Sequence, residues 1–227
     1  MDDREINAGM AGRSAGREAD RWREQLEQER ASRSRLASVL LGPTARQKRL
    51  AEEHRRWATG ARGEEMLAAT LARKCPGAVL LHDRRMPRSH ANIDHIAVTS
   101  SGVYVIDAKR HRGNIEVRSP LFGKAKLMIA GRDRTKLVTG LEKQVEVVRT
   151  TLAAVAPTVP VHGCMCFIAP EGFLADSGLP VVRTLKVNGF PLYYPRRLAK
   201  RLNRPGEVTG EQADLVYQEL GRQLRPA

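Results

Sequence analysis

The sequence is poor in aromatic residues. Aromatic side chains make up 4% of the 227 residues, whereas the hydrophobic share of 41% is close to that of an ordinary globular chain. Part of the chain should therefore contribute little to packing, and we expect that part to be the N-terminus. The length suits one principal domain with an appendage.

Cysteine is also scarce, and its pattern excludes two kinds of small scaffold. The chain has three cysteines, Cys75, Cys164 and Cys166, which form neither an even set nor a CxxC pair. Neither a disulfide framework nor a zinc ribbon is indicated, and reduced thiols in the cytoplasm are the simplest interpretation. Zinc is disfavoured at the histidines too, because their spacing matches no compact ligand pair on one element. These histidines are His82, His90, His95 and His111.

Long apolar runs and phosphate-binding loops are missing as well. No apolar stretch approaches the ~20 residues that span a bilayer, and residues 1–20 lack the apolar centre of a signal peptide. We therefore expect a cytoplasmic protein that does not contact a membrane. The short stretches "SSG" and "GARG" lack the Gly-Lys-Ser/Thr ending of a P-loop, which disfavours an NTPase.

Acidic residues are outnumbered by basic ones, and the formal net charge is +14. Residues 1–62 carry 14 basic and 10 acidic side chains, and residues 63–227 carry 25 against 15, so the excess lies mainly on the domain. A polyanionic partner is the functional interpretation, because Lys and Arg displace counterions from nucleic acid; solubility is the alternative. Two basic runs, residues 84–90 and 195–204, either track a phosphate backbone or form solvated faces.

The first 41 residues are expected to form an N-terminal extension. Residues 1–16 are polar and rich in glycine, which predicts disorder. Residues 17–40 contain helix formers with only a thin apolar stripe. This pattern predicts a helix that either binds a protein partner or a second copy of the chain, or is merely solvated. The stripe consists of Trp22, Leu26, Leu36, Val39 and Leu40.

Two more helices are predicted before the first strand. Thr44 and Gln47 have the spacing of a capping box, which starts a helix over residues 45–60. A separate helix is expected around residues 63–74, where apolar residues recur at helical spacing until "CPG" at residues 75–77 ends it.

From Ala78 onward the apolar pattern changes from helical to extended. Four strands are predicted in succession, at residues 78–87, 92–99, 102–110 and 113–118. Three or four strands in succession indicate an antiparallel meander. The later pattern predicts a helix, a buried strand and two further helices, at residues 134–155, 161–169, 195–203 and 211–224. The fold class is therefore α/β or α+β, with a sheet covered by helices.

Acidic residues interrupt two of the predicted strands. Residues two apart in a strand share a face, so Asp107 and Lys109 should project together, and the short turn should place Asp94 alongside them. This set suits phosphodiester hydrolysis, in which carboxylates hold Mg²⁺ or Mn²⁺, the metal acidifies a bound water, and a lysine orients or deprotonates the nucleophile. The alternative is an exposed strand face on which both acids pair with neighbouring arginines.

Four segments, in this order, resemble a known family. They are "GARGEEMLAATLA", "NIDHIAV", "GVYVIDAKRHRG" and "KQVEVVRTTL", between Gly60 and Leu152. Together they are similar to the nuclease-related domain (NERD), a branch of the PD-(D/E)xK nuclease superfamily. The resemblance implies a restriction-endonuclease-like mixed α/β sheet flanked by helices, here with an N-terminal helical extension. The domain would span residues 42–227, with a core at about residues 60–170.

The resemblance also implies roles for individual residues. Asp94 would be the first metal ligand, Asp107 the second acid and Lys109 the catalytic lysine. Glu64 matches the glutamate of the family's Gly-Glu motif, and Glu65 is its substitute.

Two further positions complete the comparison with the family. Gln144 matches a glutamine found in the later helix of several such nucleases, although a lone glutamine on a charged helix is also consistent with simple solvation. Ile93 stands where the superfamily's first motif has proline, and this departure removes no ligand.

Three functional hypotheses follow from the sequence. The first is a Mg²⁺-dependent nuclease acting on DNA. The second is a nucleic-acid-binding module that keeps the fold and the positive surface but does little catalysis. The third is a scaffold protein whose N-terminal helix recruits partners.

Overall fold

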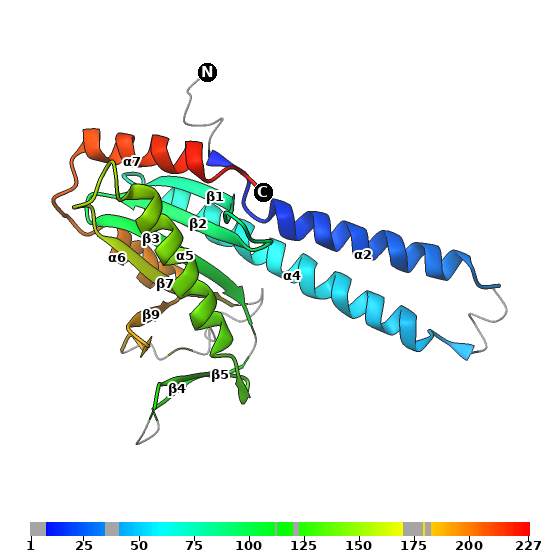
Figure 1. The fold of residues 1–227 in the computed structure, drawn as a ribbon. Coiled ribbons are helices and arrows are strands. Elements are labelled where there is room, and N and C mark those ends of the chain that lie inside the picture. The colour runs from blue at the N-terminus through cyan, green and yellow to red at the C-terminus, as the bar shows by residue number, and fades with distance from the viewer. Residues whose placement is uncertain (1–7, 35–40, 112, 120–122, 170–178, 180–182) are drawn as a thin grey trace.

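A central sheet with helices on both faces dominates the computed structural model, which describes residues 8–34, 41–111, 113–119, 123–169, 179 and 183–227 (Figure 1). The described helices are α2 (Arg13–Ala31), α4 (Ala45–Lys74), α5 (Lys136–Leu152), α6 (Pro195–Leu202) and α7 (Gly210–Gln223). The main strands are β1 (Val79–Arg85), β2 (Asn92–Thr99), β3 (Gly102–Arg110), β7 (Val161–Ile168), β8 (Lys186–Val187) and β9 (Phe190–Tyr193). The predicted class, a mixed α/β sheet flanked by helices with an N-terminal helical region, is confirmed.

The main sheet has the strand order β1-β2-β3-β7-β9-β8. β1, β2 and β3 pair antiparallel, as the predicted meander requires, and β7 then adds parallel to β3. The meander has three strands, the smaller of the two numbers predicted, and the fourth predicted strand does not join it. β4 (Ile115–Arg118) instead forms a separate small sheet with β5 (Lys126–Ile129) and β6 (Arg132–Asp133). The physical reason is that β2 and β7 already occupy both edges of β3.

Each face of the main sheet packs against its own pair of helices. Alternating side chains such as Val105 and Phe167 join one core with α5 and α7. The intervening residues, such as Tyr104 and Cys166, join a second core with Leu71 of α4 and with α6. This alternation is the expected consequence of the strand's two-residue period. All three cysteines are buried free thiols, as the sequence predicted.

Helix α4 is one continuous element of 30 residues, so the prediction of two separate helices is wrong. The capping box of Thr44 and Gln47 is confirmed at its start, and the helix ends before Cys75 as predicted. Gly63, the first residue of the second predicted helix, has a packing role within the continuous helix. A Cβ added to Gly63 would lie 2.9 Å from the Cβ of Arg110, so glycine lets the helix approach β3 closely.

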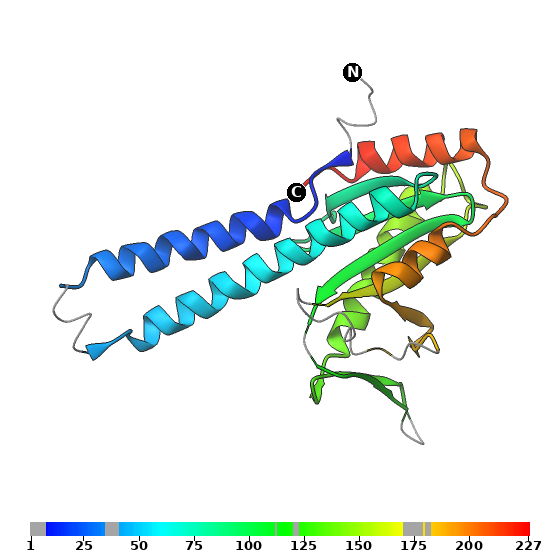
Figure 2. The same cartoon turned by 180° about the vertical axis from the view of Figure 1, so that it is seen from behind.

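The N-terminal region forms a helical hairpin in which α2 runs antiparallel along the first half of α4 and projects from the sheet (Figures 1 and 2). Gly12 lies next to Ala61 in the middle of α4, whereas Glu29 pairs with Arg46 near its start at 3.1 Å. The salt bridge between Glu29 and Arg46 therefore joins the two helices in the distal part of the hairpin. None of the described helices has both the length and the apolarity needed to cross a membrane.

Two expectations for the N-terminal region need correction. Residues 8–16 are not disordered, since α2 begins at Arg13 and buries Ala15 and Ala19. The helix also ends at Ala31 rather than continuing to residue 40. Of the predicted apolar stripe, Leu26 is buried and Trp22 is half-buried. Residues 1–7 and the remaining stripe positions Leu36, Val39 and Leu40 lie outside the described residues.

Candidate active site

Three of the predicted site residues meet at one end of the β2–β3 pair. The register pairs His95 with Ile106, which brings Asp94 alongside the end of β3. The Lys109 Nζ atom lies 2.6 Å from Asp107 Oδ1 and 3.6 Å from Asp94 Oδ2. The backbone N–H of Ala108 donates a hydrogen bond to Asp94 Oδ2 at 2.8 Å. The structure therefore gathers two carboxylates around one ammonium group.

One carboxylate oxygen of this group has no donor. Asp107 is only 6% exposed, and its Oδ2 atom is buried without a hydrogen-bond partner among the described residues. A buried acceptor that stays unsatisfied costs free energy. The open oxygen thus fits a position for a cation, and paired Asp carboxylates are the hard oxygen ligands that Mg²⁺ prefers.

Glu64 approaches this group from α4. Its Oε2 atom accepts a hydrogen bond from the backbone N–H of Gly12 at 3.1 Å. Burial, followed by the charges of Asp94 and Asp83, raises the pKa of Glu64 to about 9, although Lys109 acts in the opposite direction. Glu64 therefore holds a proton at neutral pH in this arrangement.

The pKa values of Asp94 and Lys109 reflect the same crowding of charge. Burial raises the pKa of Asp94 to about 6, and Asp107 adds to the effect while Lys109 reduces it. Burial lowers the pKa of Lys109, but Asp107 and Asp94 more than offset this and raise it above its ordinary value. Lys109 is therefore firmly protonated and donates hydrogen bonds.

Asp83 is a fourth acid at this site, and the sequence interpretation missed it. The pairs formed by its neighbours in β1 place it opposite Asp94, and its φ of 49° lies in the left-handed region. The Asp83 carboxylate accepts hydrogen bonds from Ser14 N at 2.6 Å and from Ser14 Oγ at 2.7 Å. Its charge raises the pKa of both Glu64 and Asp94. An acid inside the apolar run "AVLLHD" was the available signal.

The remaining sequence candidates occupy other positions. Gln144 is 7% exposed rather than solvated, and its Nε2 atom donates to the carbonyl of Asn92 at 3.2 Å, at the start of β2. Its Oε1 atom is buried without a partner among the described residues. Glu65, the substitute for Glu64, is half exposed and pairs with Arg62 at 3.6 Å.

The histidines do not form a metal site with other ligands. His82 and His95 share a hydrogen bond of 2.8 Å between their Nδ1 atoms. Burial lowers the pKa of both rings, that of His82 to about 4. In the part of the chain that the structure describes, no group of three or more His, Cys, Asp or Glu side chains is arranged to hold a metal ion. Mg²⁺ sites often use only one or two carboxylates and complete their shell with water and substrate phosphates.

A basic groove of about 670 Å³ lies between α2 and α4 and reaches Arg110, the residue after Lys109. We call it the hairpin groove. Its basic lining comes from both helices and from β3, and consists of Arg23, Arg30, His54, Arg55, Arg62 and Arg110. The positive groove therefore begins beside the acidic site and follows the hairpin outward.

Comparison with protein families identifies the segment that carries this site. The family model of the nuclease-related domain (NERD) matches residues 59–168. The match runs from the second half of α4 to the end of β7, and this family belongs to the PD-(D/E)xK-like nuclease fold. The resemblance inferred from the sequence is thus confirmed. No curated protein and no solved structure matches the chain.

Proposed function

We propose that the chain hydrolyses phosphodiester bonds in DNA with the help of a divalent metal ion. The reason is that residues 59–168 match the model of the nuclease-related domain family. Membership supports a nuclease-related function and an interaction with nucleic acid. The finer proposal rests on one observation, the position of Lys109 between the carboxylates of Asp94 and Asp107.

In this proposal Asp94 and Asp107 hold the metal, Mg²⁺ or Mn²⁺. When bound, the ion supplies a Lewis acid that lowers the pKa of water and offsets negative charge on a phosphoryl oxygen. The buried Asp107 Oδ2 atom, which has no donor among the described residues, supports this role. The raised pKa of Asp94 supports it too, since burial and, to a lesser extent, the charge of Asp107 disfavour its ionised form, which a bound cation would stabilise.

Lys109 acts as a hydrogen-bond donor to the attacking water and to a phosphate oxygen. Its pKa is raised by Asp107 and Asp94, so it retains its proton and is poorly suited to act as a base. Lys109 is therefore expected to orient the nucleophile rather than to deprotonate it. Glu64 carries an exchangeable proton near neutral pH and is the supporting acid.

Gln144 is proposed to act through the backbone rather than on substrate. Its amide donates to the carbonyl of Asn92, two residues before Asp94. This contact fixes the start of β2 and, through it, the carboxylate of Asp94. We therefore regard Gln144 as a positioning residue.

The hairpin groove supplies a path for the nucleic acid. Its arginines offer phosphate contacts that do not depend on sequence, and Arg110 joins the groove to the acidic site. A strand lying along α2 and α4 would present its backbone to Lys109.

The second candidate function is nucleic-acid binding with little catalysis. The observation in its favour is the 2.6 Å ion pair between Lys109 and Asp107, which partly satisfies the acid without any metal. A buried ion pair of this kind is also compatible with a purely structural role.

One panel of assays separates the two candidates. Purified full-length protein is incubated with plasmid, linear duplex, single-stranded DNA and RNA, each with Mg²⁺, Mn²⁺ or EDTA. Metal-dependent cleavage of DNA that is lost in EDTA supports the nuclease. Binding to the same substrates without cleavage under any metal condition would instead establish the binding module.

A further inference from the structure

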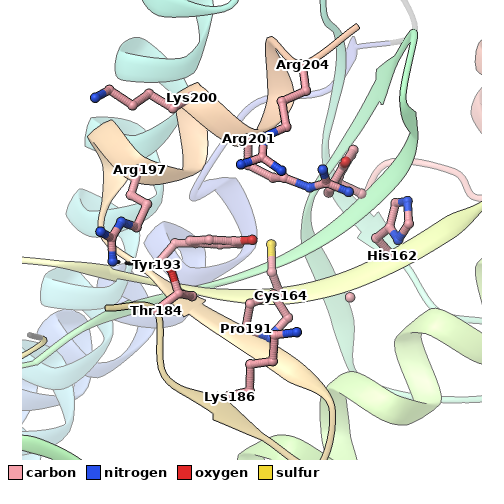
Figure 3. Close-up of a pocket in the computed structure, with 12 residues that line it drawn as sticks. His162, Cys164, Thr184, Lys186, Pro191, Tyr193, Arg197, Lys200, Arg201 and Arg204 are labelled. Atoms are coloured by element: carbon pink, nitrogen blue, oxygen red, sulfur yellow. Dashed lines mark hydrogen bonds between the residues drawn. The ribbon is translucent and has the colours of Figure 1, made fainter. Parts of the chain in front are cut away.

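A second basic concavity lies beside α6, away from the hairpin (Figure 3). We call it the α6 pocket. Its volume is about 650 Å³, within the range of small-molecule sites. Its polar lining includes Thr184, Lys186, Tyr193, Lys200, Arg201 and Arg204. A pocket of this size exceeds what a single inorganic phosphate would fill.

The α6 pocket is separate from the candidate active site. It is reached by Tyr104 near the start of β3, whereas Asp107 and Lys109 lie near the end of that strand. Tyr104 and Asp107 are three residues apart, so they project from opposite faces of the sheet. Most of the polar lining also comes from residues after 168, outside the segment that matches the nuclease-related domain.

Three of the four cations in α6 lie on the side of the helix that lines the pocket. Leu198, Ala199 and Leu202 are buried against the sheet. Arg197, Lys200 and Arg201 have the spacing of one helical face, and Arg204 lines the pocket from just beyond the end of the helix. Lys186 adds a further cation from β8 (Figure 3).

Two of these cations contact neutral groups of the pocket. The guanidinium of Arg201 lies over the Tyr104 ring, 5.5 Å from its centroid. Arg197 donates to Thr184 Oγ1 at 3.2 Å. Among the described residues, none that lines the pocket carries a carboxylate. Like charges that converge in a concavity repel one another, and an anion with several charges would relieve that repulsion.

We propose that the α6 pocket binds a nucleotide, either free or as the phosphorylated end of a nucleic-acid strand. Lys186, Lys200 and Arg204 bind the phosphate groups, and the half-buried aromatic ring of Tyr193 contacts the base or sugar. The rest of the volume accommodates the nucleoside. This site is independent of the proposed nuclease reaction and requires no metal.

The test is a set of binding measurements on full-length protein in EDTA, which removes metal-dependent contacts at the acidic site. Isothermal titration calorimetry compares ATP, AMP, adenosine and inorganic pyrophosphate. We expect ATP to bind at least about tenfold more tightly than adenosine or pyrophosphate, because each of these two lacks either the phosphates that bind the cations or the base and sugar that contact the ring. Equal affinity for pyrophosphate and ATP would overturn the nucleotide assignment, and so would the absence of binding by any of the four.

Two double variants locate the site. Lys200→Ala/Arg204→Ala removes two cations of the pocket, and Arg132→Ala/Arg196→Ala removes two exposed cations that do not line it. The first pair should weaken ATP binding by about tenfold or more, whereas the second should change it by less than about twofold. Equal effects of the two pairs would refute the pocket as the site.

The source of the nucleotide is distinguished by competition. Oligonucleotides of one sequence, with either a 5′-phosphate or a 5′-hydroxyl, compete against a fluorescent ATP analogue. Stronger competition by the phosphorylated form assigns the pocket to strand ends, and ATP binding without such competition assigns it to free nucleotides. The Asp107→Asn variant should bind ATP like the wild type, so a failed nuclease assay leaves this result interpretable.

Discussion

Negative charge at the candidate active site is concentrated on a few buried residues. Asp83 raises the pKa of Glu64 and Asp94, and Asp107 also raises that of Asp94. Lys109 is the counter-charge that lowers both values. Its ammonium could therefore stabilise the fold, the substrate complex or the reaction, and substitutions must separate these roles.

Lys109→Ala tests whether the ammonium takes part in the reaction. Turnover should fall by about 10²–10⁴-fold, the usual effect of losing a positioned proton-transfer or water-orienting group. Affinity for DNA should change little, because the hairpin groove supplies most phosphate contacts. Single-turnover cleavage and fluorescence anisotropy measure the two quantities. Cleavage at the wild-type rate by Lys109→Ala would eliminate the proposed mechanism.

Asp107→Asn is the matched control for that experiment. It keeps the side-chain shape but removes one negative charge from the pair that would hold the metal. Mg²⁺ activation should weaken while DNA binding is kept, and circular dichroism should show that both variants remain folded.

The raised pKa of Glu64 predicts a pH-dependent stability. The folded state keeps a proton on Glu64 up to about pH 9, whereas the unfolded chain releases it near the ordinary value of 4.5. The stability that depends on protonated Glu64 is therefore fully present below pH 4.5, its pKa in the unfolded chain. This stability is lost as the pH rises through about 9, the pKa of Glu64 in the folded state. Metal-free Glu64→Gln should accordingly melt at a higher temperature than the wild type at about pH 9, and the difference should shrink at about pH 5.

Glu65→Gln is the control for this pH profile, because Glu65 is half exposed and pairs with Arg62. Its melting temperature should follow that of the wild type at both pH values. Parallel profiles for Glu64→Gln and the wild type would show that Glu64 is not the buried acid described here.

At the scale of secondary-structure elements, α2 is tied to the active site through its first turn. Gly12 N–H donates to Glu64, and Ser14 donates to Asp83. The start of α2, within the predicted N-terminal extension, is therefore packed on the candidate active site. The boundary between an extension and a domain at residues 41 and 42 stays a prediction, as does binding of a protein partner or a second copy through this helix.

Gly12→Ala and Gly16→Ala form a matched pair that tests this attachment. Gly12 has a φ of 74°, and an added Cβ would lie 2.7 Å from the Ala61 carbonyl oxygen. Alanine there should destabilise the fold by about 1–3 kcal/mol. Gly16 lies within α2, with no atom within 4 Å of an added Cβ. Alanine there should stabilise the helix by about 0.4–1 kcal/mol.

The free energy of unfolding from urea titrations checks both changes. Nuclease activity should fall only in Gly12→Ala, since that change displaces the N–H that Glu64 accepts. A stabilising effect of Gly12→Ala would contradict the close approach of α2 to α4.

Local elements were predictable from sequence where the signal itself is local. The capping box at Thr44 and the strand period around Asp107 and Lys109 depend on residues that lie only two or three positions apart in the sequence. The continuity of α4 was not predictable, because Gly63 serves a contact with Arg110 on β3. The role of Asp83 was hidden for the same reason, since its left-handed backbone goes with contacts to Ser14, 69 residues away in sequence.

At the scale of the whole molecule, the net charge of +14 is distributed over an extended shape. The helical hairpin projects from the sheet (Figure 2). The hairpin groove is lined by residues of both of its helices and by Arg110. A positive groove that ends beside an acidic site attracts the phosphate backbone while leaving the acids free to bind a cation. Affinity for nucleic acid should then depend on salt and be largely independent of sequence.

Salt titrations of DNA binding in EDTA test this arrangement with a charge-matched pair. Wild-type affinity for DNA should fall steeply between ~50 and ~200 mM salt, because the release of counterions on binding becomes less favourable as the salt concentration rises. Arg30→Ala/Arg55→Ala removes two cations of the hairpin groove, and Arg21→Ala/Arg56→Ala removes two exposed cations on the same helices that do not line it. Each phosphate contact contributes about 0.9 to the magnitude of the slope of log affinity against log salt. The slope of the groove variant should therefore be shallower than that of the wild type by about 2. The second variant should keep the wild-type slope, because its arginines already pair with Glu18 and Glu53. Equal slopes for the two variants would mean that binding follows net charge alone, and DNA would then have no defined path to Lys109.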